Sequence, residues 1–87
     1  MAKLLIIDDE RAIRSTLREI LEYENYDVED IDNGIDGLEM IKKGNFDLVL
    51  CDIKMNKMDG MEVLEQAQII KPDLPFIMIS GHGTVET

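Results

Sequence analysis

The sequence predicts an α/β fold built on a parallel sheet, and two observations support this. Three apolar runs of four residues each, Leu4–Ile7, Leu48–Cys51 and Phe76–Ile79, are short and are apolar throughout rather than at alternate positions. Strands that are buried on both faces of a parallel sheet have this pattern. Segments with helical periodicity fall between the runs, and strand–helix alternation at this spacing gives a parallel sheet with right-handed crossovers.

The first helix is expected at about residues 10–24. Ile13, Leu17 and Leu21 recur there at a spacing of four, which is typical of a helix with one apolar face. This pattern places the charged side chains, among them Arg14, on the face exposed to solvent.

Two further helices and a fourth strand complete the alternation. A helix over Ile35–Lys43 is expected to stop at Gly44, and another is expected to run from Gly60 or the next residue to Lys71, because Pro72 cannot continue it. A weaker strand is expected at Tyr26–Ile31, where acidic residues suit an edge position. The chain then ends with what resembles the start of another helix, at residues 84–87.

Composition narrows the class of protein. The chain has 87 residues, enough for one small domain, with 45% hydrophobic and 32% charged residues. No apolar run is long enough to span a membrane, and we see no pattern typical of a secretory signal. The single cysteine, Cys51, excludes an internal disulfide and is expected to be a buried thiol. We therefore expect a cytoplasmic protein. The net charge of −10 disfavours contact with nucleic acid or an anionic membrane. This acidity indicates either solubility or a cation site made of carboxylates.

Polar residues follow each of the three apolar runs. Asp8 and Asp9 follow the first, Asp52 the second and Ser80 the third. Ligands of parallel α/β sheets bind at the carboxyl ends of the strands, so these four side chains are expected at one edge of the sheet. Three carboxylates repel one another there unless a cation or bound protons intervene. An all-oxygen site suits Mg²⁺ or Mn²⁺ better than zinc, and an aspartate at a strand tip can act as a nucleophile that accepts a phosphoryl group.

Each of these residues also has an ordinary structural interpretation. Asp8 or Asp9 can cap the following helix, Asp52 can be a loop residue, and Ser80 can be a turn residue before a glycine. Their joint occurrence at three strand ends is what favours a functional acidic site.

Four motifs, in this order and spacing, resemble the receiver domain of bacterial two-component response regulators. They are Leu4–Glu10, Asp47–Met55, Met58–Gly60 and Ile77–Gly81. The resemblance covers essentially the whole chain, and the ending Ser80–Thr87 is most similar to receivers attached to enhancer-binding transcriptional activators of the nitrogen-regulatory type. It implies a flavodoxin-like, doubly wound sheet of strand order 2-1-3-4, in which residues 1–87 form a receiver domain without its fifth strand and last helix.

The resemblance also implies a role for each site residue. Asp52 would accept a phosphoryl group from a sensor histidine kinase and would bind Mg²⁺ together with Asp9, with Asp8 through water and with the backbone carbonyl of Lys54. Ser80 would be the switch hydroxyl that moves toward the phosphoryl group. The module would act as a signalling switch for a transcription-regulating output domain rather than as an enzyme, with weak self-phosphorylation and autophosphatase activity expected in the full domain.

Two departures from the family pattern carry expectations of their own. Asn56 stands where these proteins usually have proline, which predicts a less rigid loop after the phosphoacceptor. The family's lysine at the end of a fifth strand has no counterpart in the 87 residues, so phosphorylation is expected to be impaired. Without a fifth strand, Phe76–Ile79 is expected to be an open apolar edge that can pair with a second copy in a homodimer or swapped dimer.

Two other function classes compete with the phosphoacceptor hypothesis. Phosphatases similar to haloacid dehalogenases carry a second aspartate two residues after the nucleophile, where this chain has Lys54. The other alternative is a fragment that cannot be phosphorylated and acts only as a dimerisation or interaction module.

Overall fold

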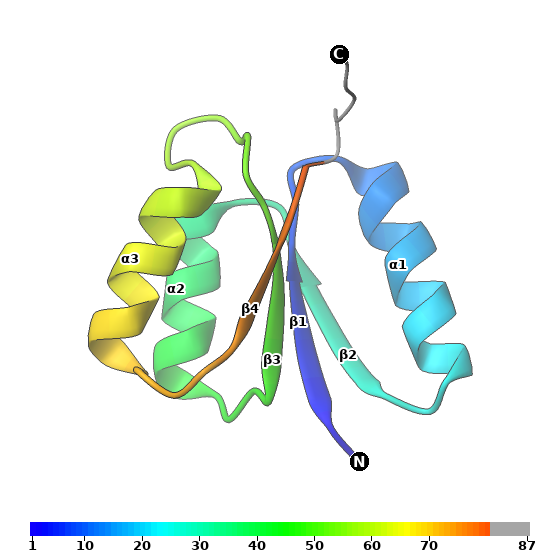
Figure 1. Cartoon of the computed structure of the whole chain (residues 1–87). Helices are drawn as coiled ribbons and strands as arrows, with labels where there is room; N and C mark the ends of the chain where they lie inside the picture. The colour runs from blue at the N-terminus through cyan, green and yellow to red at the C-terminus, as the bar shows by residue number, and fades with distance from the viewer. Residues whose placement is uncertain (81–87) are drawn as a thin grey trace.

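The computed structural model describes residues 1–80 as a four-stranded parallel sheet with helices on both faces (Figure 1). The strand order β2-β1-β3-β4 confirms the predicted α/β topology, with β2 at one edge. The expected helix start at residues 84–87 lies outside the described residues. No helix in the described range is long and apolar enough to cross a membrane. The elements are β1 Lys3–Ile7, α1 Arg11–Tyr23, β2 Asp27–Ile31, α2 Gly34–Lys43, β3 Leu48–Asp52, α3 Gly60–Ile70 and β4 Phe76–Ile79.

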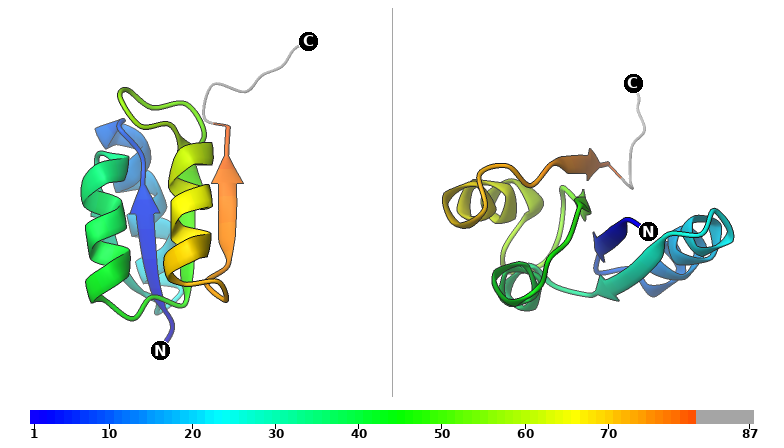
Figure 2. Two further views of the ribbon diagram at one scale, coloured as in Figure 1. Left: turned by 90° about the vertical axis from the view of Figure 1, so that its left-hand side faces the viewer. Right: turned by 90° about the horizontal axis from the view of Figure 1, so that it is seen from below.

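The main core lies between the sheet and the helices α2 and α3. These two helices pack side by side on one face of the sheet, and α1 lies on the other face (Figure 2). Alternate residues of β1 and β3 point toward α2 and α3 because successive side chains of a strand face opposite sides. The buried core members are Leu5, Ile7, Leu38, Ile41, Val49, Cys51, Val63 and Ala67.

The face of the sheet that carries α1 is covered less completely. No residue of α1 is fully buried, although its apolar stripe lies against β1 and β2. Leu48 and Leu50 of β3 are half-buried on this face, and Ile77 of β4 is 50% exposed. An open apolar groove therefore runs beside α1, lined by Ala2, Leu4, Leu21, Tyr26, Asp47, Leu48, Leu50 and Ile77.

The helix ends differ from the sequence-based expectations by about one residue, with identifiable causes. α2 begins at Gly34 because the Asn33 side chain caps it, accepting a hydrogen bond from the amide of Asp36 at 2.8 Å. Gly44 follows α2 as predicted but has extended backbone, with φ −103°, so no left-handed cap forms there. The left-handed turn is instead at Asn25 after α1, with φ 71°.

Gly60, the first residue of α3, packs directly on the end of β3. Its amide donates to the carbonyl of Ile53 at 2.8 Å, and a Cβ atom at this position would lie 2.0 Å from the carbonyl oxygen of Asp52. Only glycine fits such a contact with backbone, so the start of α3 and the strand end beneath it are set against each other without intervening atoms.

Replacing Gly60 with alanine is expected to destabilise the domain by about 3 kcal/mol, because backbone must move to admit the methyl group. The free energy of unfolding from urea titration measures this loss. Gly44→Ala is the control: its nearest neighbour is the edge of the Phe46 ring, which can shift, so a smaller loss is expected. Equal losses of stability in the two variants would contradict the prediction that the close contact between Gly60 and the Asp52 carbonyl excludes a methyl group.

Candidate functional site

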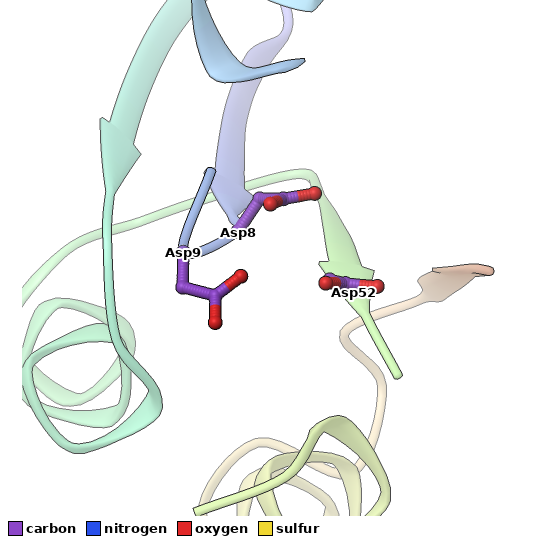
Figure 3. Close-up of side chains that lie close together, drawn as sticks. All are labelled: Asp8, Asp9 and Asp52. Carbon is purple, nitrogen blue, oxygen red and sulfur yellow. The ribbon is translucent and has the colours of Figure 1, made fainter. Parts of the chain in front are cut away.

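Three carboxylates meet at the carboxyl ends of β1 and β3. Asp8 and Asp9 follow β1 directly, and Asp52 is the last residue of β3 (Figure 3). One oxygen from each of the three carboxylates lies within 4.8 Å of the others. The predicted convergence of these side chains is therefore present in the structure.

The register of the sheet produces this arrangement. β1 and β3 pair in parallel, with Ile7 opposite Cys51, so the residues that come next, Asp8 and Asp52, are brought side by side. On its other side, the amide of Asp8 donates to the carbonyl of Ile31 in β2 at 3.1 Å. Asp8 is thus held between its two neighbouring strands.

Two of the carboxylates are buried and lack partners. Asp8 and Asp52 are each 1% exposed. Asp8 accepts one hydrogen bond, from the amide of Glu10 to Oδ1 at 2.8 Å, whereas its Oδ2 and both oxygens of Asp52 have no hydrogen-bond partner in the described structure. Buried polar atoms are normally satisfied, so three unpaired carboxylate oxygens in one place indicate a ligand site.

Burial raises the pKa of the Asp8 carboxyl above its usual value, and the nearby carboxylates of Asp52 and Asp9 raise it further. The hydrogen bond from the Glu10 amide opposes this, but the net pKa shift is upward. A cation bound between these carboxylates would oppose this upward pKa shift, since it favours the charged form of each carboxylate. Burial also raises the pKa of the Cys51 thiol to about 12, which agrees with the expected inert core cysteine.

Asp9 is half-buried and lies at the opening of the site. It borders an open pocket between the loops that follow β1, β2 and β3. Lys57, in the loop after β3, has a left-handed backbone conformation with φ 67°. The residues lining this pocket are Asp9, Asp32, Asn33, Ile35, Asp36, Asn56 and Lys57.

The remaining predicted site residues lie near this edge of the sheet. Ser80 is exposed and follows β4, whose last residue, Ile79, accepts a hydrogen bond from the amide of Ile53 at 2.9 Å. Lys54 is exposed in the loop after β3. The structure places both at the correct end of the sheet, and their roles remain predictions.

The structure does not support the interpretation of Asp8 or Asp9 as the cap of α1. Glu10 occupies the N-cap of α1 and makes no capping hydrogen bond with its side chain, while Asp8 accepts a bond from the Glu10 amide. Asp59, by contrast, caps α3: its side chain accepts a hydrogen bond from the amide of Glu62 at 3.0 Å.

Arg14 contradicts the expectation of a solvent-exposed side chain. Only 16% of the side chain is exposed, and its Nη1 donates to the carbonyl oxygen of Asp8 at 2.9 Å. Helical periodicity missed this contact because it assigns a side chain to a face of the helix and does not show how far a long arginine reaches. The acidic residue Asp30, near the end of β2, was the available signal that a cation lies nearby.

Comparison with known proteins identifies a family and several relatives. The family model described as "Response regulator receiver domain" matches residues 4–87. The response regulator MprA of Mycobacterium leprae is 34% identical over 83 residues, which cover 95% of this chain and 36% of MprA. The transcriptional regulatory protein GlrR of Escherichia coli is 33% identical over 84 residues, covering 97% of this chain and 19% of GlrR. The chain therefore spans about a third or less of the length of these relatives.

Solved structures show the same fold. A CheY-like response regulator receiver domain from Methanospirillum hungatei has a TM-score of 0.91 and 38% identity, covering 98% of this chain and 68% of that one. The response regulator TrrA of Thermotoga maritima, solved in complex with Mg(2+)-BeF, has a TM-score of 0.88 and 36% identity, covering 94% and 73%. TrrA has also been solved in complex with the histidine kinase ThkA; this match has a TM-score of 0.90 and 33% identity, covering 100% and 75%.

The raised pKa of Asp8 predicts how the stability of the metal-free domain depends on pH. A carboxyl whose pKa is higher in the folded state stabilises that state at low pH, and this contribution is lost as pH rises through the folded pKa. Asp8→Asn keeps an oxygen for the Glu10 amide and removes one charge. We expect it to stabilise the domain at pH 7 by about 1 to 4 kcal/mol, the Coulomb energy of two unit charges 4 Å apart at effective dielectric constants of 80 to 20.

Urea unfolding between pH 4.5 and pH 7 in the presence of a chelator measures this effect. The control is Asp73→Asn, which removes one charge from an exposed loop before β4. A destabilising effect of Asp8→Asn at pH 7 would contradict the interpretation that the charged Asp8 carboxylate is unfavourable in the metal-free folded state.

Proposed function

The chain belongs to the response regulator receiver domain family, and on that premise we propose that it is a phosphoacceptor switch in which Asp52 takes a phosphoryl group from a sensor histidine kinase. The switch is inferred to act on an output domain that regulates transcription, in line with the names of its relatives.

One observation carries this proposal: the Asp52 carboxylate is buried at a strand end with both oxygens unpaired. A carboxylate whose lone pairs are engaged by hydrogen bonds is a poor nucleophile, and this one is free. Its position on β3, between β1 and β4, holds it fixed in the middle of the sheet. The neighbouring carboxylates supply the place for a cation that an incoming phosphoryl group requires.

The donor set fits Mg²⁺. The carboxylates of Asp8, Asp9 and Asp52 offer hard oxygen ligands, and three of their oxygens have no hydrogen-bond partner among residues 1–80, namely Asp8 Oδ2 and Asp52 Oδ1 and Oδ2. We infer that the backbone carbonyl of Lys54 joins them, since it lies two residues beyond Asp52 at the same edge of the sheet. When bound, Mg²⁺ supplies charge neutralisation for the carboxylates and for phosphoryl oxygens.

The proposed reaction is a transfer between two covalent carriers. An oxygen of Asp52 attacks phosphorus and forms an acyl phosphate bond, while the phosphorus–nitrogen bond to the kinase histidine breaks and the imidazole leaves with the electron pair. Asp8 and Asp9 hold the cation close to Asp52, and the Ser80 hydroxyl donates a hydrogen bond to a phosphoryl oxygen of the product. Water later cleaves the acyl phosphate and restores the carboxylate, which is the weak autophosphatase activity of this proposal.

The proposed partner follows from the likeness to TrrA, which has been solved with a histidine kinase. We propose accordingly that the receiver acts in the cytoplasm, where it would meet a kinase of this class.

Incubation with acetyl phosphate and Mg²⁺ is expected to add the mass of one phosphoryl group, at the impaired rate expected without the family's lysine, as measured by intact mass spectrometry. Asp52→Asn removes the nucleophile and is expected to abolish the gain. Asp9→Asn is expected to slow it roughly tenfold or more, because it removes a proposed metal ligand.

Asp73→Asn serves as the matched control and is expected to load like the parent protein. Loading in Asp52→Asn, or loading that persists unchanged when a chelator replaces Mg²⁺, would contradict the proposed acceptor or its metal dependence. A folded parent chain that never loads would favour the alternative of an interaction module.

We also propose that β4 pairs with β4 of a second copy of the chain. Within the described residues, β4 pairs with β3 along one edge and with no strand along the other. The strand carries no charge, and Ile77 is 50% exposed beside the apolar groove next to α1. Such an edge is a template for a further strand, and two-fold symmetry would make the pairing antiparallel.

Ile77→Lys is expected to shift the protein toward the monomer in sedimentation velocity experiments, because a lysine on an edge strand opposes pairing. Ile69→Lys is the matched control, since Ile69 is 83% exposed on α3 and lines a hollow between α2 and α3 rather than the groove beside β4. A parent chain that stays monomeric at high micromolar concentration would overturn the dimer proposal.

A further inference from the structure

We propose that Arg14 of α1 is a positioning residue for the metal ligands, which it serves by holding the peptide group between Asp8 and Asp9. The inference rests on the proposed function, because it concerns the affinity of that site for Mg²⁺. Among residues 1–80, Arg14 forms no hydrogen bond or ion pair with the carboxylates of Asp8, Asp9 or Asp52; its partners are the Asp8 carbonyl and the Asp30 side chain.

The guanidinium of Arg14 bridges two elements. Its Nη1 donates to the Asp8 carbonyl oxygen at 2.9 Å, and its Nε donates to Oδ1 of Asp30 on β2 at 3.1 Å. With 16% of the side chain exposed, both bonds lie partly shielded from water. The rigid planar fork of an arginine suits this two-point contact better than a lysine does.

This contact completes the restraint on Asp8. Its amide is bound to the Ile31 carbonyl, its Oδ1 to the amide of Glu10 and its carbonyl oxygen to Arg14. In the part of the chain that the structure describes, Oδ2 of Asp8 is left without a hydrogen-bond partner, and the Asp8 carboxylate belongs to the three-carboxylate cluster. Because the peptide group is planar, fixing the Asp8 carbonyl also fixes the direction in which the chain leaves toward Asp9.

Asp30 explains why the arginine binds a carbonyl rather than the carboxylates close by. It accepts from Arg14 through Oδ1 and from Arg18 through Oδ2, so its negative charge lies against both guanidinium groups. Arg18 is held in addition by Glu22, one turn along α1. Arg14 is thereby retained on the β2 side and does not neutralise the site that the cation needs.

The two possible effects of Arg14 on cation binding have opposite signs. If the residue acted through its charge alone, its removal would strengthen Mg²⁺ binding, because a positive charge near a cation site opposes occupancy. If it positions Asp8 and Asp9, its removal weakens binding. Residues that orient metal ligands typically contribute 10- to 100-fold to metal affinity.

The experiment measures the Mg²⁺ dissociation constant of the whole chain by isothermal titration calorimetry. Arg14→Met keeps an unbranched apolar side chain and removes the donors, and we expect 10- to 100-fold weaker binding. Arg18→Met is the matched control: it removes the same charge and the other Asp30 contact, but leaves the Asp8 carbonyl bonded. It is expected to bind Mg²⁺ as tightly as the parent or slightly more tightly.

A second variant covers the case in which Arg14→Met does not fold. Arg14→Lys retains the charge, loses the fork, and is expected to bind Mg²⁺ several-fold more weakly, with faster hydrogen exchange of the Glu10 amide in the metal-free state. If the parent binds Mg²⁺ and the folded Arg14 variants bind it equally or more tightly, the inference is overturned while the proposed function stands. If the parent itself does not bind Mg²⁺, the proposed metal site fails and the positioning role fails with it.

Discussion

The electrostatic repulsion between two buried carboxylates at adjacent strand ends is the constraint around which this domain is organised. Parallel pairing of β1 with β3 leaves no freedom here: once Ile7 lies opposite Cys51, Asp8 and Asp52 must lie side by side. Burial in the middle of the sheet then withholds the water that would otherwise screen them. This repulsion lowers the stability of the folded state. The loss is offset because β1 and β3 also contribute fully buried apolar side chains to the core.

The surroundings of the site position these charges without cancelling them. Asp8 is restrained by the Ile31 carbonyl, the Glu10 amide and the Arg14 guanidinium, while α3 packs against the Asp52 carbonyl through Gly60. None of these contacts places a positive charge on the unpaired carboxylate oxygens. In the part of the chain that the structure describes, the carboxylate cluster is therefore held in shape while its negative charge remains available to a cation from solution.

The sequence was sufficient to predict the sheet and the acidic cluster. It was insufficient to predict the side-chain hydrogen bonds that hold the cluster in place. Uninterrupted apolar runs identify strands buried on both faces, and the residues after such strands must meet at one edge, so the convergence of Asp8 and Asp52 follows from topology. The bond from Arg14 to the Asp8 carbonyl could not be predicted in this way. It depends on the reach of a long side chain across the edge of α1 and on its pairing with Asp30 of another strand, and periodicity reports neither. The early start of α2 was missed for a related reason, because Asn33 acts through a local side-chain bond.

The strands that carry the site residues are restrained to different degrees. β1 and β3 are each paired on both edges, and shifting either would break two ladders and disturb the core under α2 and α3. Within residues 1–80, β4 is paired on one edge only, its apolar residues are half-buried or exposed, and the exposed Ser80 follows its last residue. Local opening costs least where few buried contacts are lost. If Asp52 is phosphorylated as proposed, the phosphoryl group would meet restrained acidic side chains on the β1 side and the weakly restrained β4 on the other, where the proposed switch hydroxyl of Ser80 could move at low cost.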